Sequence, residues 1–396
     1  MNVFVTGVGV VSALGIGIKA NFKALKCHKS GIRPNKIIEN LLEETFVGEL
    51  PLSNIELKNL LQVPVETNAP RTALLGMLAS NEALGNTLLD NKVRSGFIGG
   101  STVGGMDLSE DYFRGVYLEG NHENVTYLTT HDLGTVTDII AKNCGEPGYV
   151  NTISTACSSS ANSIMLGARM IKNGLLDRVL VGGNDALSRF TINGFRSLMI
   201  YDKEICKPFD KNRKGLNLGE GAGYLLLENE TSLTQSKNKI LASLVGWHNA
   251  NDAYHQTGTS PEGDGAMKAM KGALAYAGLQ SNSINHINAH GTATQNNDQS
   301  ELNAINRIFG DTGINFSSTK GYTGHTLGAS GGIEAVYSVL SLINQCVFPN
   351  INWSTPMDNN MRKPVLDFKD NVAITHVMSN SFGFGGNSTS LIFSKS

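Results

Sequence analysis

The stretch VNTISTACSSSANSIMLGARMIKNGLLDRVLVGGN, residues 150–184, predicts a strand, a helix and a second strand in direct succession. Its two ends, VNTIST and DRVLVGGN, are rich in β-branched residues, whereas the segment between them spaces its apolar residues as a helix does. We expect this helix to end near Lys172, with Gly174 as its C-terminal cap. Strands that alternate with helices in this way predict an α/β fold.

Further strand-like runs extend the pattern along the chain, several of them apolar without alternation, as in strands buried on both faces. They are residues 3–10, 95–100, 223–228, 240–249, 286–290, 314–319 and 372–381. The same order of elements occurs twice, which predicts a duplicated βα unit with halves at residues 1–245 and 246–396. Residues 30–67 are polar and irregular, and we interpret them as an excursion from the first half.

Composition excludes several classes of protein. The 396 residues carry 32 Lys plus Arg against 34 Asp plus Glu, and 40% of them are hydrophobic. This balance predicts a large core and gives no attraction to nucleic acid or to an anionic membrane. No apolar run reaches the roughly 18 residues of a spanning helix, and the N-terminus lacks the basic start of a signal peptide. Scattered, odd-numbered cysteines favour a reducing compartment, so we expect a cytoplasmic protein: Cys27, Cys144, Cys157, Cys206 and Cys346.

Two motifs that suggest cofactor or metal binding fail on inspection. TGVGVVSALG follows a strand, but the acidic residue that a dinucleotide site needs about 20 positions later is missing, so we interpret its glycines as a tight turn. His286 and His290 have the i, i+4 spacing of a zinc pair on a helix. Their segment reads as a strand, where such residues lie about 13 Å apart. We therefore expect no metal and no bound cofactor.

Cys157 lies between a predicted strand and a predicted helix. Free backbone N–H groups at a helix N-terminus stabilise an anion, so this position is expected to lower the thiol pKa and favour the thiolate nucleophile. Ser158, Ser159 and Ser160 can cap the helix. Buried structural cysteines are commoner than catalytic ones, so Cys157 alone does not establish a site.

Other reactive side chains occupy similar positions. His290 follows a predicted strand, and His325 lies between a strand and a helix, with Lys320 five residues before it. In α/β sheets, sites gather beyond the carboxyl ends of strands. Phe384 lies within the Gly-rich segment NSFGFGGNS, where its backbone N–H can face a reacting oxygen. Either histidine alone is more often an ordinary turn residue, and the glycines alone predict only a bend.

At these residues the chain resembles the β-ketoacyl-acyl-carrier-protein synthases, the condensing enzymes of fatty-acid and polyketide synthesis. The motifs occur in the family's order and spacing over essentially the whole chain: STACSSS, KPFDKNRKGLNLGEGAGYLLLE, HGTAT, KGYTGHTLGASGGIEA and NSFGFGGNS. The resemblance implies an α/β thiolase fold, in which two βαβαβαββ halves form five layers, α-β-α-β-α.

The resemblance also implies roles for individual residues. Cys157 would accept the acyl chain, and His290 and His325 would complete a Cys-His-His set of the elongating type. Lys320 and Glu334 match supporting residues beside the histidines. The positions implied for substrate binding are the gate Phe384, Thr292 and Thr294 for the phosphopantetheine arm, His255 and Thr257 beside the malonyl site, and Ser109 at the floor of the acyl pocket.

The implied partner is an acyl carrier protein, which brings its own phosphopantetheine, and the implied assembly is a homodimer or a heterodimer. Carrier proteins of these pathways are acidic, and a docking patch is one interpretation of five basic residues close in sequence: Lys203, Lys207, Lys211, Arg213 and Lys214. A solvated loop is the other interpretation.

Some positions depart from the family pattern. HGTAT has Ala293 where glycine is usual, and NSFGFGGNS has Asn387 and Ser388 where Thr-Asn is common. None of these changes removes a catalytic group, but they leave open whether the pathway is housekeeping fatty-acid synthesis or a specialised polyketide or polyene pathway.

Three other functions compete with condensation. A non-catalytic partner subunit commonly lacks the nucleophile, which is present here. A degradative thiolase usually has a second cysteine near the C-terminus, which NSFGFGGNS lacks. A cysteine hydrolase needs neither His325 nor the gate.

Overall fold

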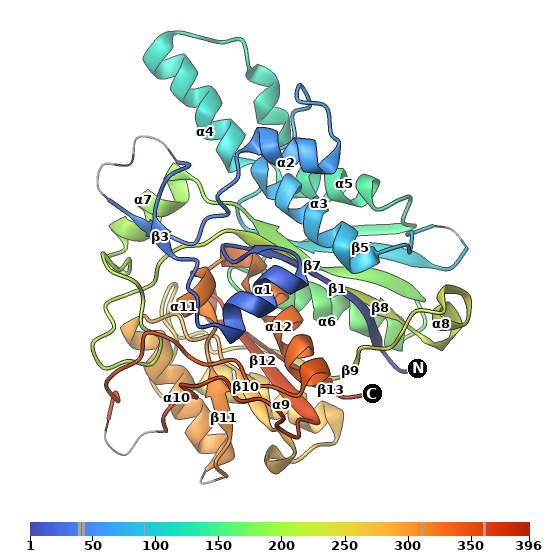
Figure 1. Cartoon of the computed structure of the whole chain (residues 1–396), viewed down its shortest axis with the longest axis vertical. Helices are drawn as coiled ribbons and strands as arrows, with labels where there is room; N and C mark the ends of the chain where they lie inside the picture. The colour runs from blue at the N-terminus through green and yellow to red at the C-terminus, as the bar shows by residue number, and fades with distance from the viewer. Residues whose placement is uncertain (39–40, 42–43, 91, 311, 359–361) are drawn as a thin grey trace.

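A computed structural model describes residues 1–396 except 39–40, 42–43, 91, 311 and 359–361. Within the described residues, each half of the chain supplies five strands to the main sheet path (Figure 1). The first half supplies β1 (Phe4–Ser12), β5 (Ser95–Gly100), β6 (Tyr149–Ile153), β7 (Arg178–Asp185) and β8 (Gly221–Glu228). The second half supplies β9 (Ala242–Asn251), β10 (His286–Asn288), β11 (Asn315–Ser317), β12 (His376–Phe382) and β13 (Asn387–Ser394).

The topology confirms the duplication. The strands lie in the order β1-β8-β7-β5-β6 in the first half and β9-β13-β12-β10-β11 in the second, the same permutation of their sequence order. The first two pairings of each run are antiparallel and the last two are parallel. The halves join edge to edge where Phe4 pairs with Ser243 and Val5 with Ala242. The first repeat therefore ends with β8, and the second begins with β9. The division at residues 245/246 stays a prediction.

Helices complete the five layers that the resemblance implied. The central layer is formed by α6 (Ser159–Lys172) and α12 (Ser330–Asn344), which pack on each other and on strands of both halves. The outer layers are α3 (Arg71–Leu84) with α5 (Leu133–Asn143), and α9 (Asp264–Ala277) with α10 (Gln295–Phe309). One buried apolar cluster spans the centre, with Val181 and Leu225 from the first half beside Ile333 and Val377 from the second. The thiolase-type α/β fold is confirmed.

The remaining elements are short and mostly lie in excursions from the repeat. Residues 13–67 contain β2 (Gly15–Ile16), α1 (Ile18–Lys26), β3 (Arg33–Pro34), β4 (Phe46–Val47) and α2 (Asn54–Leu61). Later excursions hold α4 (Met106–Arg114), η1 (Gly115–Glu119), η2 (Val125–Thr130), α7 (Arg189–Ser197), α8 (Glu230–Ser236), η3 (Ser281–Ser283), α11 (Lys320–Thr323), η4 (Leu327–Ala329) and η5 (Phe384–Gly386). The interpretation of residues 30–67 as irregular missed α2, although Ser53 and Glu56 form a capping box at its start.

The tight turn predicted from TGVGVVSALG occurs at the end of this stretch, where Ala13 and Leu14 connect β1 to β2 and Gly15 has φ 123°, but Gly7 and Gly9 lie inside β1. These glycines let α3 approach the strand: a Cβ on Gly9 would lie 2.0 Å from the carbonyl oxygen of Ala79. Gly7 and Gly9 therefore provide close helix–strand packing, whereas Gly15 belongs to the turn.

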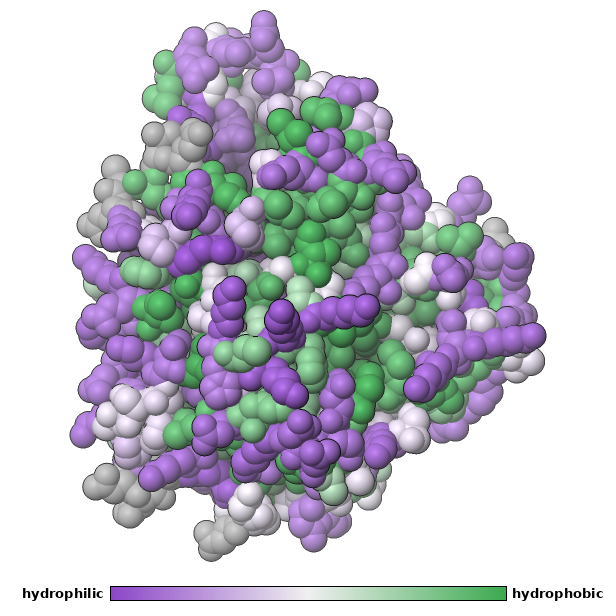
Figure 2. Space-filling model, viewed as in Figure 1, coloured by the Kyte–Doolittle hydropathy of each residue, from purple (hydrophilic) through white to green (hydrophobic). Residues whose placement is uncertain are grey.

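The surface is mixed in character. Figure 2 shows polar side chains over most of one face and an apolar area over α2 and α3, and Ile55 and Leu60 of α2 are more than half exposed. Among the described residues, no helix combines the length and apolar character needed to cross a bilayer. In the same part of the chain, no three His, Cys, Asp or Glu side chains gather in a way that could hold a metal ion.

Candidate active site

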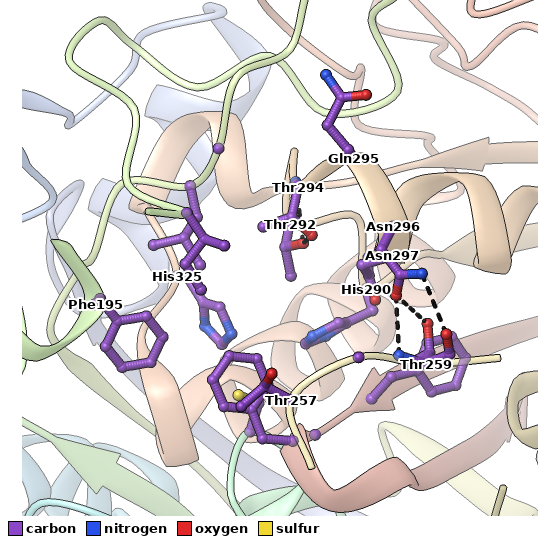
Figure 3. Close-up of a pocket in the computed structure, with 18 of the residues that line it drawn as sticks. Phe195, Thr257, Thr259, His290, Thr292, Thr294, Gln295, Asn296, Asn297 and His325 are labelled. Carbon is purple, nitrogen blue, oxygen red and sulfur yellow. Dashed lines mark hydrogen bonds between the residues drawn. The ribbon is translucent and has the colours of Figure 1, made fainter. Parts of the chain in front are cut away.

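The ends of three strands bring the predicted catalytic residues to one cavity of about 340 Å³. Cys157 follows β6, His290 follows β10, and His325 follows β11 and α11. Figure 3 shows the rings of His290 and His325 pointing into this cavity, with Phe195 at its side. Thr292, Thr294, His255, Thr257 and Phe384 also line it, so eight of the predicted site residues meet here.

The nucleophile turn, residues 155–158, presents Cys157 to the cavity with its side chain almost wholly buried. Ala156, just before it, has φ 53°, a left-handed backbone conformation that residues other than glycine adopt at a cost in free energy. Burial raises the pKa of Cys157 to about 11, against the lowering effects of the Lys320 charge and of the Phe384 and Cys157 N–H groups. The expectation of a lowered thiol pKa is therefore wrong, because removal from water outweighs the helix N-terminus.

The serines after Cys157 do not cap α6 with their side chains as expected. Ser158 is the N-cap residue, but its side chain makes no capping bond. Instead its hydroxyl lies 2.7 Å from the carbonyl oxygen of Thr155 and 2.7 Å from Asn387 Oδ1. These acceptors fold the nucleophile turn back on itself and tie it to the start of β13.

The two histidines of the cavity are neutral and present the same nitrogen to it. Their ring centroids lie 5.3 Å apart at an interplanar angle of 87°. Leu327 N–H donates to His325 Nδ1 at 3.2 Å, and the Lys320 ammonium, which can only donate, lies 3.2 Å from His290 Nδ1. Burial, reinforced by the Lys320 charge, holds the pKa of both rings well below the usual value. Each neutral ring therefore carries its proton on Nε2.

Lys320 and Glu334 form a buried pair behind His290. They make a short ion pair, and Lys320 Nζ also donates to the His290 carbonyl oxygen at 2.6 Å. Burial raises the pKa of Glu334 to about 7, although the Lys320 charge opposes this. The pair fixes the position and tautomer of His290, in line with the supporting role that the resemblance implied.

Acidic residues of α10 hold the turn that carries His290, and the sequence analysis did not identify them. Glu301 accepts the backbone N–H groups of His290 at 2.9 Å and Gly291 at 2.8 Å, and burial raises its pKa to about 7. Asp298 accepts the N–H of Ala293, which has φ 69°. Their spacing of three residues, which places both on one face of α10, was the available signal.

Phe384 lies in the gate loop, residues 383–387, and stacks on Phe195 of α7. The ring centroids are 5.8 Å apart and the rings are inclined by 21°. Asp252, in the segment predicted to border the malonyl site, donates its N–H to the Gly386 carbonyl oxygen at 3.3 Å. The sequence did not identify Phe195, because no local pattern links α7 to the gate loop.

Of the remaining predicted residues, Thr292 and Thr294 line the cavity with their hydroxyl oxygens 2.9 Å apart. His255 Nδ1 accepts the N–H of Thr257 at 3.2 Å. Ser109 does not reach this cavity. It is buried in α4, with its hydroxyl 2.8 Å from His131 Nδ1, and borders a separate apolar hollow of about 580 Å³.

The cluster of basic residues, for which a docking patch and a solvated loop were the two interpretations, is smaller at the surface than expected. Arg213 is buried, donates to the Thr294 and Gln295 carbonyl oxygens and lies near Asp298, so it belongs to the interior. Lys207 and Lys214 both pair with Glu204, at 3.2 and 3.3 Å. Lys214 also borders the cavity. The sequence could not show which of these charges face inward.

Comparison with known proteins identifies the family. The family model described as "Beta-ketoacyl synthase, N-terminal domain" matches residues 1–232, and "Beta-ketoacyl synthase, C-terminal domain" matches residues 241–354. The chain belongs to the β-ketoacyl synthase family. It is 32% identical over 409 residues to 3-oxoacyl-[acyl-carrier-protein] synthase 2 of Staphylococcus aureus, with 100% of this chain and 98% of that protein covered. The protein of the same name from Vibrio cholerae is 34% identical over 420 residues, with 99% of each covered.

Solved structures of ketosynthases have the same fold over the whole chain. A chain of the ishigamide ketosynthase/chain length factor superposes with a TM-score of 0.92 at 27% identity, covering 100% of this chain and 99% of that one. A chain from a ketosynthase in complex with its chain length factor, from Xenorhabdus doucetiae, gives 0.82 at 30% identity, covering 100% and 98%. The expected family, fold and condensing class of enzyme are thereby confirmed. The roles of individual residues stay predictions.

Proposed function

We propose that this β-ketoacyl synthase extends an acyl chain held on Cys157 by decarboxylative condensation with a malonyl thioester, both delivered by an acyl carrier protein. His290 and His325 stabilise the enolate. The observation that carries the proposal is the geometry of two neutral imidazoles, which turn protonated Nε2 atoms into one cavity beside the thiol.

In the first half-reaction, Cys157 Sγ attacks the acyl thioester. The backbone N–H groups of Cys157 and Phe384 are the donors for the developing oxyanion, and both already act on the sulfur. The new thioester forms as the bond to the carrier sulfur breaks, and the Cys157 proton leaves on the carrier thiol.

In the second half-reaction, the malonyl thioester loses CO2 and its electron pair is held as an enolate. Two Nε2–H donors suit this step, because negative charge builds on one carbonyl oxygen. The enolate carbon then attacks the acyl group on Cys157, and the released thiolate takes up a proton. The step uses no metal or redox cofactor, and phosphopantetheine enters as part of the carrier substrate.

The two half-reactions can be tested separately. We expect His290→Ala and His325→Ala to change acylation of Cys157 by no more than about threefold. Each should lower release of labelled CO2 from malonyl-carrier protein by about 10²-fold or more, the usual cost of losing one such donor. His376→Ala, outside the cavity, is the control. Unchanged CO2 release in both variants would remove the histidines from the reaction.

We also propose that two copies of the chain associate through the β6 side of the sheet. β6 is the last strand of its sheet path and has no neighbour beyond it in the described residues. Open strand edges favour pairing with another chain. Exposed apolar side chains surround the hollow beside Ser109: Phe113, Tyr117, Leu118 and Phe190. The neighbouring structures named as complexes with a chain length factor make a heterodimer the competing assembly.

A further inference from the structure

Asn387 joins two segments that the proposed mechanism uses separately. It is the last residue of the gate loop and the first of β13, and it is one of the positions where this chain departs from the Thr-Asn common in the family. Its backbone carbonyl oxygen accepts the N–H of Gly383 at 2.8 Å and so closes the loop that carries Phe384. Its side chain, in contrast, contacts the nucleophile turn.

The side-chain oxygen of Asn387 is the centre of a polar cluster. It accepts hydrogen bonds from Ser158 Oγ at 2.7 Å, Asn162 Nδ2 at 2.9 Å and Asn249 Nδ2 at 2.7 Å. Ser158 follows Cys157 directly, and Asn162 lies one turn later on α6. One amide oxygen therefore links β9, β13 and the first turn of the nucleophile helix.

The same cluster fixes the nucleophile turn itself. Asn162 Nδ2 donates to Thr155 Oγ1 at 2.8 Å, and Thr155 Oγ1 lies 3.1 Å from Ser158 Oγ. Thr155 and Ser158 bracket Ala156, whose φ of 53° is costly without support. Loss of the acceptor on Asn387 would leave buried donors unpaired and free the turn to relax.

The gate loop and the nucleophile turn are in direct contact. A Cβ on Gly383 would lie 2.9 Å from the Thr155 carbonyl oxygen and 3.1 Å from the Cys157 nitrogen. The two N–H groups proposed for the oxyanion, on Cys157 and Phe384, thus come from segments that Asn387 bonds to at once. Two donors must be held at a fixed separation to serve one oxygen.

We propose that Asn387 is a positioning residue that sets the spacing of the two oxyanion donors by tying the gate loop to the nucleophile turn. The inference rests on the proposed acylation of Cys157. It assigns Asn387 an effect on the rate of acyl transfer and none on carrier binding, because its side chain faces the cluster.

The test is single-turnover acylation of Cys157 from acyl-carrier protein at graded concentrations. Asn387→Ala is expected to lower the maximal rate about tenfold and to leave the half-saturating concentration within about twofold. Ser158→Ala should have a similar effect. Both changes break the same hydrogen bond. The maximal rate of the double variant should therefore be about tenfold below that of the wild type, as in each single variant, and not a hundredfold below it.

Thr389→Val is the matched control. Thr389 is buried in the same cluster and forms hydrogen bonds with Asn162 and Asn249, but its side chain forms none with Ser158 or Asn387. We expect it to lower the melting temperature while keeping the maximal rate within about twofold. If Asn387→Ala does not fold, Asn387→Leu replaces it, since leucine is similar in size and has no acceptor for Ser158.

The outcomes separate the two proposals. A wild-type chain that is not acylated on Cys157 contradicts the proposed function. A wild-type chain that is acylated, with an unchanged maximal rate in the Asn387 variants, overturns only the positioning role. So would multiplicative losses in the double variant, a change confined to the half-saturating concentration, or a Thr389→Val variant that is equally slow.

Discussion

The thiol of Cys157 rests in its neutral form, because the segments packed around it exclude water. With a pKa of about 11, only about one molecule in 10⁴ carries the thiolate at pH 7. The Lys320 charge and two N–H groups favour that minor form without making it dominant. The site therefore stabilises negative charge on the oxygen of the reacting acyl group more than it stabilises a thiolate on Cys157 in the resting protein.

This predicts the pH dependence of Cys157 alkylation. Iodoacetamide reacts with the thiolate, so the rate should rise about tenfold per pH unit from pH 7 to pH 9, without a plateau. The measurement follows the Cys157 peptide by mass spectrometry in a Cys27→Ser background, because Cys27 is the exposed free cysteine. A plateau below pH 8 would show that the thiol pKa is lowered and not raised.

Individual residues show what the sequence can and cannot predict. Motifs with family-specific order were sufficient to name Cys157, His290, His325 and Phe384, and all four meet at one cavity. The predicted direction of the Cys157 pKa shift was wrong, because burial is the largest cause of the shift and depends on the packing of the whole fold. The local sequence predicts the helix N-terminus at Cys157, but it does not predict that the thiol is buried away from water.

At the scale of elements, the gate loop is held by its contact with the 252–260 segment. Gly385 and Gly386 both have positive φ, 81° and 77°. A Cβ on Gly386 would lie 2.2 Å from Asp252 Oδ1, whereas a Cβ on Gly385 would meet nothing within 4 Å. Asp252 is itself fixed, since it accepts the N–H groups of Tyr254 and Ser260.

The two glycines provide a matched pair of substitutions. Gly385→Ala adds backbone strain alone, about 1–3 kcal/mol at most. Gly386→Ala adds the same strain and also displaces the loop from Asp252. We expect Gly386→Ala to slow acylation of Cys157 at least tenfold more than Gly385→Ala does, measured by the rate of acyl transfer. Equal rates would mean that the contact with Asp252 does not position the gate.

The end of α6 near Lys172 was predictable, because the apolar periodicity of this segment is strong. Residue positions were not predictable where tertiary contacts decide. Ser109 was expected at the floor of the acyl pocket, and α4 places it beside a hollow that is separate from the cavity of Cys157. Arg213 was expected at the surface, yet it lies inside near Asp298. In each case the deciding partner is far away in the sequence.

At the scale of the whole molecule, the repeated strand order places the two halves so that the nucleophile comes from one and both histidines from the other. The sequence repeat was too faint to establish this, but the topology shows it directly. Joining the halves is what brings Cys157 within reach of the imidazoles. We propose that a second copy of the chain joins in a similar way, at the open edge of β6.

We expect the protein to be a dimer at micromolar concentration, measured by light scattering. Leu118→Asp, in the apolar surface beside Ser109, should shift it toward monomer, because a charge would have to be buried. Leu60→Asp on α2 is the control: Leu60 is 58% exposed and Leu118 71%. A monomeric wild-type protein would contradict the homodimer and favour a separate partner subunit.

The most direct test of the account is the site of acylation. The protein is mixed with acyl-carrier protein, and the modified peptide is identified by mass spectrometry. We predict that the acyl group lies on Cys157 and that Cys157→Ala takes up none. Addition of malonyl-carrier protein should then clear the adduct and yield a β-ketoacyl product. Acylation of another residue, or undiminished acylation of Cys157→Ala, would contradict the mechanism.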